Sequence, residues 1–129
     1  MSREAQVFEA AAALVDAFAS NDTARYFACF SPQASFVFHS LAQPLQTRAE
    51  YQALWQQWQT EGFAVLGCES SNGRVSVHGD VAIFVHDVAT HVRFAEEEQQ
   101  LQERETIVFR VEGERWLAWH EHLSVATAT

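Results

Sequence analysis

The stretch LQERETIVFRVEGERWLAWHEHLSV, at residues 101–125, decides the fold of this chain. Apolar and polar residues alternate along both halves, which predicts two β-strands, at 101–111 and 115–125. Glu112 and Gly113 lie between the strands, and short glycine-containing segments of this kind form tight hairpin turns. The sequence therefore predicts an antiparallel hairpin here.

The register of this hairpin decides which side chains share a face. With 112–113 as the turn, Glu105 pairs with His120. Since side chains alternate along a strand, one face carries Glu105, Ile107, Phe109, Trp116, Ala118, His120 and His122. We interpret this face, apolar in its middle and polar at its end, as a pocket floor. A one-residue change in turn length would exchange the two faces and bring Arg104 and Arg110 into the pocket, where they would favour an anionic ligand.

The chain upstream of the hairpin changes from a helical to an extended pattern. Apolar residues three to four apart predict helices, and Thr47 with Glu50 forms a capping box that opens the third one. Alternation and a tight turn at 78–80 predict a second pair of long strands. The predicted order is helix, helix, strand, helix, strand, strand, at residues 3–20, 23–30, 34–40, 47–61, 65–77 and 81–94.

Composition bounds the class of protein. The chain has 129 residues, 48% of them apolar, which predicts one domain over residues 1–129 with one core. Its net charge of −9 disfavours nucleic acid and anionic membranes as partners. Charged residues interrupt the N-terminal apolar segment, so we expect no secretion signal and a cytoplasmic protein with reduced cysteines.

Helices gathered early and strands gathered late predict an α+β fold with helices on one face of the sheet. The other face is then left uncovered. A symmetric contact between two copies is the usual way to bury such a face. We therefore expect a homodimer formed through the sheet.

Several stretches resemble one superfamily. They are Phe27–Phe36, Arg104–Thr106, Gly113–Trp116 and His120–Ser124. With the order of elements, they resemble the nuclear-transport-factor-2-like superfamily, in its SnoaL-like and ketosteroid-isomerase-like branch. The resemblance covers essentially the whole chain. It implies a cystatin-like, cone-shaped fold in which a curved, mixed sheet and three N-terminal helices enclose a pocket.

The chain departs from the catalytic pattern of the ketosteroid isomerases in that superfamily. They place a general-base aspartate at the end of the first strand, where this chain has Phe38, His39 and Ser40. They also use a tyrosine and a protonated aspartate to bind an oxyanion. We expect no equivalent pair here, because Tyr26 and Tyr51 lie on predicted helices.

The candidate catalytic residues are His39, Glu105 and His120. Histidine titrates near neutral pH, and a carboxylate beside an imidazole fixes its tautomer. The structural alternative for each is a histidine or an ion pair that only closes a strand end. The candidate ligand-binding residues are Trp55, Trp58, Phe109, Trp116 and His122, and for the aromatic ones core packing is the alternative.

His120 and His122, two apart on a strand, could also form a metal pair. A zinc or iron site needs at least a third protein ligand, and no fixed spacing supplies one. We therefore predict no metal and no cofactor.

Two functions remain open for this sequence. The first is a cofactor-free isomerase, cyclase or dehydratase that uses histidine and glutamate acid–base chemistry on a small apolar substrate. The second is a non-catalytic module of the same fold that dimerises and holds a ligand.

Overall fold

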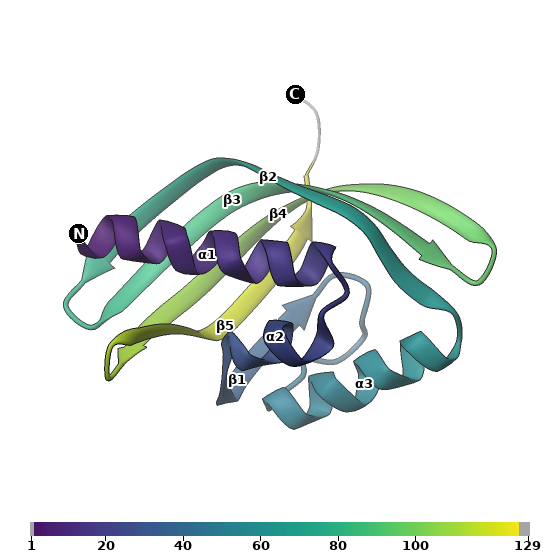
Figure 1. Ribbon diagram of the computed structural model, residues 1–129, viewed down its shortest axis with the longest axis horizontal. Coiled ribbons are helices and arrows are strands. Elements are labelled where there is room, and N and C mark those ends of the chain that lie inside the picture. The colour runs from purple at the N-terminus through teal and green to yellow at the C-terminus, as the bar shows by residue number, and fades with distance from the viewer. Residues whose placement is uncertain (1, 127–129) are drawn as a thin grey trace.

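The computed structural model describes residues 2–126 as one curved sheet with helices along its concave face (Figure 1). The sheet has the strand order β1-β5-β4-β3-β2. β1 runs parallel to β5, and the other neighbours are antiparallel. The elements in chain order are α1 (Arg3–Ala19), α2 (Thr23–Ala28), β1 (Phe30–Phe38), α3 (Arg48–Thr60), β2 (Phe63–His78), β3 (Val81–Phe94), β4 (Glu97–Glu112) and β5 (Arg115–Val125).

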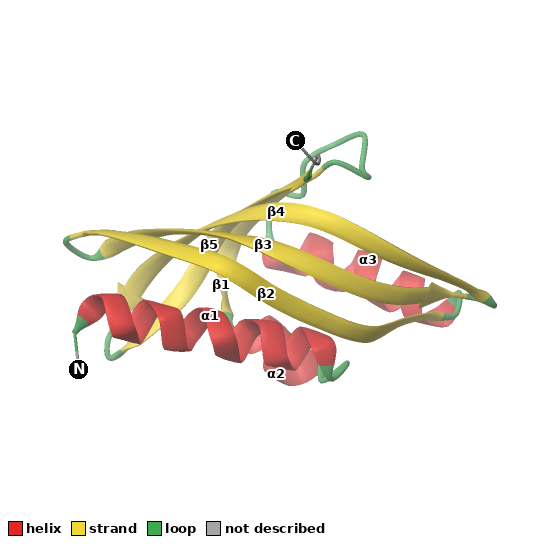
Figure 2. Ribbon diagram, turned by 90° about the horizontal axis from the view of Figure 1, so that it is seen from above, coloured by secondary structure: helices red, strands yellow, loops and turns green. Residues whose placement is uncertain are grey.

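The helices begin where capping residues allow. The Thr47 hydroxyl accepts a hydrogen bond from the backbone N–H of Glu50 at 3.2 Å, which confirms the predicted start of α3. Seen from above, α1 runs beside β2 at one end of the sheet, and α3 lies toward the other end (Figure 2). The space between α1 and α3 is where a cavity can form.

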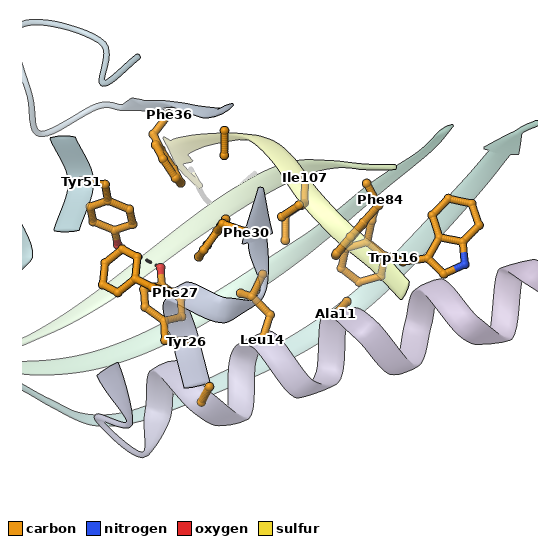
Figure 3. Close-up of a cluster of buried hydrophobic side chains, with 14 of the residues drawn as sticks. Ala11, Leu14, Tyr26, Phe27, Phe30, Phe36, Tyr51, Phe84, Ile107 and Trp116 are labelled. Atoms are coloured by element: carbon orange, nitrogen blue, oxygen red, sulfur yellow. Dashed lines mark hydrogen bonds between the residues drawn. The ribbon is translucent and has the colours of Figure 1, made fainter. Parts of the chain in front are cut away.

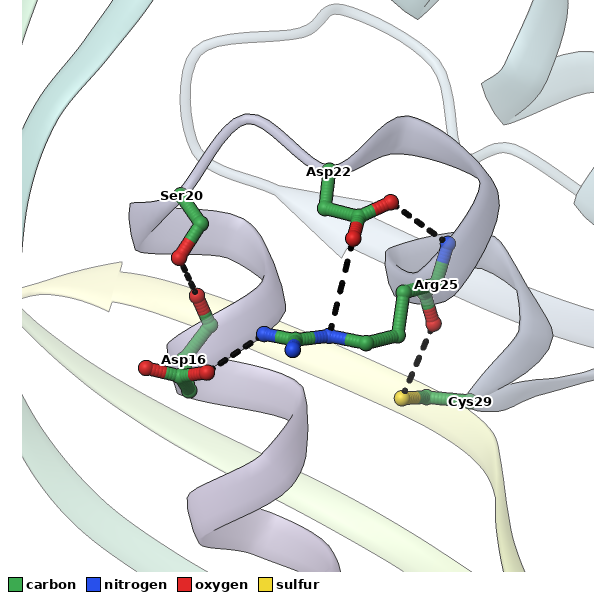
Figure 4. A network of polar contacts seen from close by, with 5 residues as sticks. All are labelled: Asp16, Ser20, Asp22, Arg25 and Cys29. Atoms are coloured by element: carbon green, nitrogen blue, oxygen red, sulfur yellow. Dashed lines mark hydrogen bonds and ion pairs between the residues drawn. The ribbon is translucent and has the colours of Figure 1, made fainter.

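An ion-pair network joins α1 to α2 (Figure 4). The Arg25 guanidinium contacts the Asp16 carboxylate on α1 and the Asp22 carboxylate at the start of α2. Asp22 also caps α2 by accepting from the backbone N–H of Arg25 at 3.2 Å. These contacts fix the angle at which α2 leaves α1, and α2 carries one wall of the cavity.

Aromatic side chains fill the core between the sheet and the helices (Figure 3). Tyr26, Phe27, Phe30, Phe36 and Tyr51 are all buried, and neighbouring rings meet edge-on or tilted. Such contacts add to the gain from burying apolar area. The core thus holds α2, β1 and α3 together at one end of the sheet.

Several element boundaries differ from prediction. The second helix ends at Ala28 rather than at residue 30, and β1 begins at Phe30 rather than at 34. The predicted loop at 95–100 is mostly strand, since β4 begins at Glu97. Strand pairing with β3 along 97–100 outweighs the acidic composition of that segment.

The closing hairpin corrects the predicted register. Glu112 pairs with Arg115, so the turn is Gly113 and Glu114 rather than 112–113. Gly113 adopts a φ of +63°, which glycine tolerates without strain. This shift preserves the predicted face for Trp116 and Ala118, which are both buried.

A β-bulge then changes the face of the residues that follow. Phe109 pairs with Ala118, but Val108 pairs with His120, so Trp119 has no partner on β4. Trp119 is held on the outer face, because its indole N–H donates to Glu112 and the Arg110 guanidinium stacks on its ring. Beyond the bulge the inward residue is Glu121.

Candidate functional site

A cavity of about 160 Å³ lies between the concave face of the sheet and the three helices. Its walls are mainly aromatic and aliphatic, and three glutamates interrupt them. Among the described residues that line it, none is an arginine. The tyrosines, tryptophans and glutamates of the lining are Tyr26, Tyr51, Trp55, Trp58, Glu103, Glu105 and Glu121.

Two carboxyl groups meet on the floor of the cavity. Glu105 lies on β4 and Glu121 on the neighbouring β5, and Glu121 is 1% exposed. Burial raises the pKa of Glu121 well above the ordinary glutamate value, and the charge of Glu105 and a hydrogen bond to it raise that pKa further. Two carboxylates this close do not both ionise in an apolar site. Burial and this neighbour therefore favour the neutral acid form of Glu121.

Glu121 also has a free oxygen. Among the described residues, none provides a hydrogen-bond partner for its buried Oε2 atom. An ionised carboxylate with a buried, unpaired oxygen would be costly, whereas a protonated acid can donate a hydrogen bond from this group. A neutral Glu121 has a single O–H, which either bonds Glu105 or turns toward a ligand in the cavity, and its Oε2 atom has no other partner among the described residues.

Two tyrosine hydroxyls add donors beside the acid (Figure 3). The hydroxyls of Tyr26 on α2 and Tyr51 on α3 lie 2.9 Å apart, and both side chains line the cavity. Burial raises the pKa of each well above 10, and Glu121 adds to the shift in both. Either hydroxyl can donate to the other, so the proton of the accepting one stays free for a ligand. The sequence did not predict this contact between two tyrosines on separate helices.

An imidazole lies on the other side of the carboxyl pair. His86 on β3 is buried, and its Nε2 atom is 2.8 Å from Oε1 of Glu105. Its Nδ1 atom is 2.6 Å from the Ser70 hydroxyl on β2. His86 and His91 differ in parity along β3 and therefore face opposite sides of the sheet, and His86 is the one that faces the core.

Of the predicted catalytic residues, His39 lies at the rim. Its Nε2 atom is 2.5 Å from Oε2 of Glu103, and Glu103 lines the cavity. Glu105 lies in the cavity, as its predicted face required. The structure does not bring Glu105 and His120 together, since Glu105 pairs with Leu123 across the strands.

His120 and His122 follow the bulge and lie on the outer face of the sheet. The Nδ1 atom of His120 is 2.8 Å from the Ser35 hydroxyl on β1, and burial and the neighbouring His122 lower its pKa. His122 is exposed. The bulge that moves both histidines outward is the feature that the sequence did not reveal.

The predicted ligand-binding aromatics divide into two groups. Trp55 and Trp58 line the cavity from α3. Phe109 and Trp116 are buried at the other end of the sheet, and the Trp116 indole N–H donates to Gln6 on α1 at 2.9 Å. These two residues pack the core under α1 and do not reach the cavity.

Cys68 lines the cavity, but its thiol is not activated. Burial raises its pKa to about 11, and its sulfur lies 3.7 Å from the Thr90 hydroxyl. Within residues 2–126, no group of three or more His, Cys, Asp or Glu side chains is placed to hold a metal ion. In the same range, no helix is long and apolar enough to cross a membrane.

Comparison with known proteins points to one family. The model of a SnoaL-like domain matches residues 7–128. Among curated proteins, no sequence matches.

Solved structures with the same fold share little sequence with the chain. An NTF2-like (nuclear-transport-factor-2-like) protein from Cytophaga hutchinsonii is 13% identical, with a TM-score of 0.85 over 98% of this chain and 100% of the other. An NTF2-like protein with a cystatin-like fold from Novosphingobium aromaticivorans is 14% identical, with a TM-score of 0.74 over 98% and 83%. A candidate dehydratase of the NTF2-like family from Streptomyces avermitilis is 20% identical, with a TM-score of 0.75 over 95% of each chain.

Proposed function

The chain belongs to the SnoaL-like domain family, and from that premise we propose that it is a cofactor-free enzyme that moves a proton on a small, uncharged, apolar carbonyl compound. Isomerisation and dehydration are the reaction types that fit this chemistry. The observation that carries the proposal is the buried Glu121, whose Oε2 atom has no partner among the described residues, in a largely apolar cavity.

The carboxyl pair can serve as acid and base together. Glu121 donates its proton to the carbonyl oxygen while the Glu105 carboxylate takes a proton from the adjacent carbon. The C–H electrons form the enol double bond, and the carbonyl π electrons form the new O–H bond. The pair holds one proton before and after this step, so the reverse transfer to a different carbon completes an isomerisation.

A hydroxyl of the tyrosine pair can hold the carbonyl oxygen beside Glu121. Donors fixed in a dry site stabilise the charge that develops on an oxygen far better than water does. Tyr26 and Tyr51 are placed for this by the core packing of α2 and α3. His39 pairs with Glu103, which lines the cavity, and we expect it to contact the outer end of a ligand.

Size and charge define the substrate class. A cavity of about 150 Å³ accommodates benzene, so 160 Å³ fits a molecule with a single ring. Three glutamates line the cavity, and no arginine is among the described residues that do so. The chain also carries a net charge of −9. Both features disfavour carboxylates and phosphates as ligands.

The test is proton exchange on small cyclic ketones. We expect the protein to catalyse deuterium uptake beside the carbonyl of 2-cyclohexenone and the conversion of 3-cyclohexenone to 2-cyclohexenone, followed by NMR and ultraviolet absorbance. Glu121→Gln should slow both by about 10²–10⁴-fold, the usual contribution of a general acid or base. Glu114→Gln, in the exposed hairpin turn, is the matched control and should leave the rates unchanged.

Binding measured on the same ketones separates the two functions that the fold allows. Binding without exchange above the buffer rate would overturn the enzyme and support the non-catalytic module. Absence of both binding and exchange would overturn both functions. Tighter binding of benzoate than of the ketones would overturn the uncharged substrate class.

We also propose that two copies pair through the outer face of the sheet. On that face Ile83 is 40% exposed, and it pairs across the strands with the half-buried Val108. Burying this apolar area between two copies is favourable. Sedimentation velocity should give a dimer that Ile83→Glu converts to a monomer, and a wild-type monomer at micromolar concentration would overturn the pairing.

A further inference from the structure

A row of polar side chains crosses four neighbouring strands of the sheet. It runs from Ser70 on β2 through His86 on β3 and Glu105 on β4 to Glu121 on β5. The proposed reaction uses only the two glutamates. Ser70 and His86 need another explanation.

His86 occupies a costly position. The inward-facing residues on either side of it on β3, Phe84 and Val88, are buried and apolar, and the Phe84 ring lies 4.8 Å from the imidazole. A buried imidazole costs free energy unless its nitrogens are hydrogen-bonded. Both nitrogens of His86 are paired, and the Nε2 partner is a carboxyl group of the site.

We propose that His86 is a positioning residue that decides which carboxyl group of the pair carries the proton, and that Ser70 fixes its ring. This proposal rests on the proposed function, because it concerns the same pair. His86 donates from Nε2 to Glu105, which holds Glu105 in the ionised form and leaves the proton on Glu121.

The direction of this hydrogen bond follows from the donors available. In the proposed arrangement the Ser70 hydroxyl donates to Nδ1, so Nε2 carries the ring hydrogen and donates it to Oε1 of Glu105. A hydrogen bond to a charged acceptor is stronger than a neutral one, so this contact favours the charged form of Glu105 over its acid form. Glu121 has no such donor on its Oε2 atom among the described residues, so the proton is better held by Glu121, which can share it with Glu105.

Ser70 completes the arrangement from the outer end of the row. Its hydroxyl meets Nδ1 at 2.6 Å, and the residue is exposed to solvent. The ring is therefore held at both nitrogens, and rotating it would break both bonds at once. This is how an outer residue fixes the tautomer of an inner imidazole.

The experiment is carbon NMR on the full chain with labelled glutamate carboxyl groups, at constant neutral pH. Protonated and ionised carboxyl carbons resonate at different shifts, and Glu105 and Glu121 should lie near opposite extremes in the wild type. In His86→Leu the donor is lost, so the two signals should move toward each other by equal fractions as the proton becomes shared. His86→Gln restores an N–H donor and should return both signals toward their wild-type positions.

His91→Leu is the matched control, because it removes an imidazole from the same strand that pairs with the exposed Glu98 at 3.0 Å. It should leave both carboxyl signals in place. A backbone amide spectrum of each variant shows that the fold is retained.

The outcomes distinguish this inference from the proposed function. Two wild-type signals that both report ionised carboxylates would overturn the neutral acid, and with it the proposed reaction. A wild-type pair with the proton on Glu121 that is unchanged in His86→Leu would overturn only the role of His86. Equal movement in His91→Leu would also overturn that role, because the effect would then be a general one of the strand.

Discussion

Replacing Glu121 with glutamine should change how the stability of the protein depends on pH. The unfolded chain ionises this group near the ordinary glutamate pKa of 4.5, whereas in the folded protein burial and Glu105 raise its pKa well above that. Above pH 4.5 the folded protein therefore holds a proton that the unfolded chain has lost. The stabilisation is complete below the unfolded pKa and is lost as pH rises toward the folded pKa.

The magnitude follows from linkage between proton binding and folding. One proton held by the folded state alone makes the free energy of unfolding fall by about 1.4 kcal/mol per pH unit within that window. For a chain of this length, the melting temperature should fall by roughly 5 °C per pH unit from this group. Glutamine has a shape similar to that of glutamate and cannot ionise, so this part of the slope should disappear in Glu121→Gln.

The assay is urea unfolding at a series of pH values from about 4 upward, below which the group is protonated in both states, with thermal melts alongside. The difference between wild type and Glu121→Gln isolates the one group, because the other titrating residues are common to both. Glu114→Gln is the control, since Glu114 is exposed in the hairpin turn and should leave the slope unchanged. Parallel curves for wild type and Glu121→Gln would refute the neutral acid.

Three further predictions concern single side chains. Tyr51→Phe should lower the free energy of unfolding by about 1–3 kcal/mol, because it leaves the buried Tyr26 hydroxyl without its partner at 2.9 Å. An unchanged free energy of unfolding in urea would contradict that pairing. Phe36→Ala should cost about 3–5 kcal/mol in the same assay, because Phe36 is fully buried among aromatic rings, and a cost below about 1 kcal/mol would contradict the core as described. Burial raises the pKa of the Cys68 thiol to about 11. At mildly alkaline pH this thiol should therefore react with a disulfide reagent far more slowly in the native protein than in urea. Equal rates would show that the Cys68 thiol is accessible in the native protein.

Local patterns in the sequence predicted most of the fold, because the physics behind those patterns is local. The pair of Thr47 and Glu50 predicted the start of α3, since a capping box needs only neighbouring residues. Alternation predicted the long strands and the inward face of Glu105. The start of β1 was predicted less well, because pairing with β5, which is distant in sequence, extends it. The start of β4 was missed because pairing with the end of β3 outweighs the acidic composition of that segment.

Most of the candidate site could not be predicted from the sequence, because its contacts join residues that lie far apart along the chain. Glu121 meets Glu105, and Tyr26 meets Tyr51, only after the strands and helices have packed. Alternation along the strand allows at most one of His86 and His91 to face the cavity. The spacing alone could not show that the inward one meets Glu105, because that depends on the register between β3 and β4.

The bulge at Trp119 decides the chemistry of the cavity. In an unbroken strand, alternation from the inward Ala118 would place His120 inward and Glu121 outward. An imidazole would then face Glu105, and the two would form an ion pair with no neutral acid. Because Arg110 and Glu112 hold Trp119 on the outer face, the strand takes up one extra residue and Glu121 enters instead. The imidazole is supplied from β3, on the far side of Glu105, so the cavity keeps a carboxyl group that can hold and give up a proton.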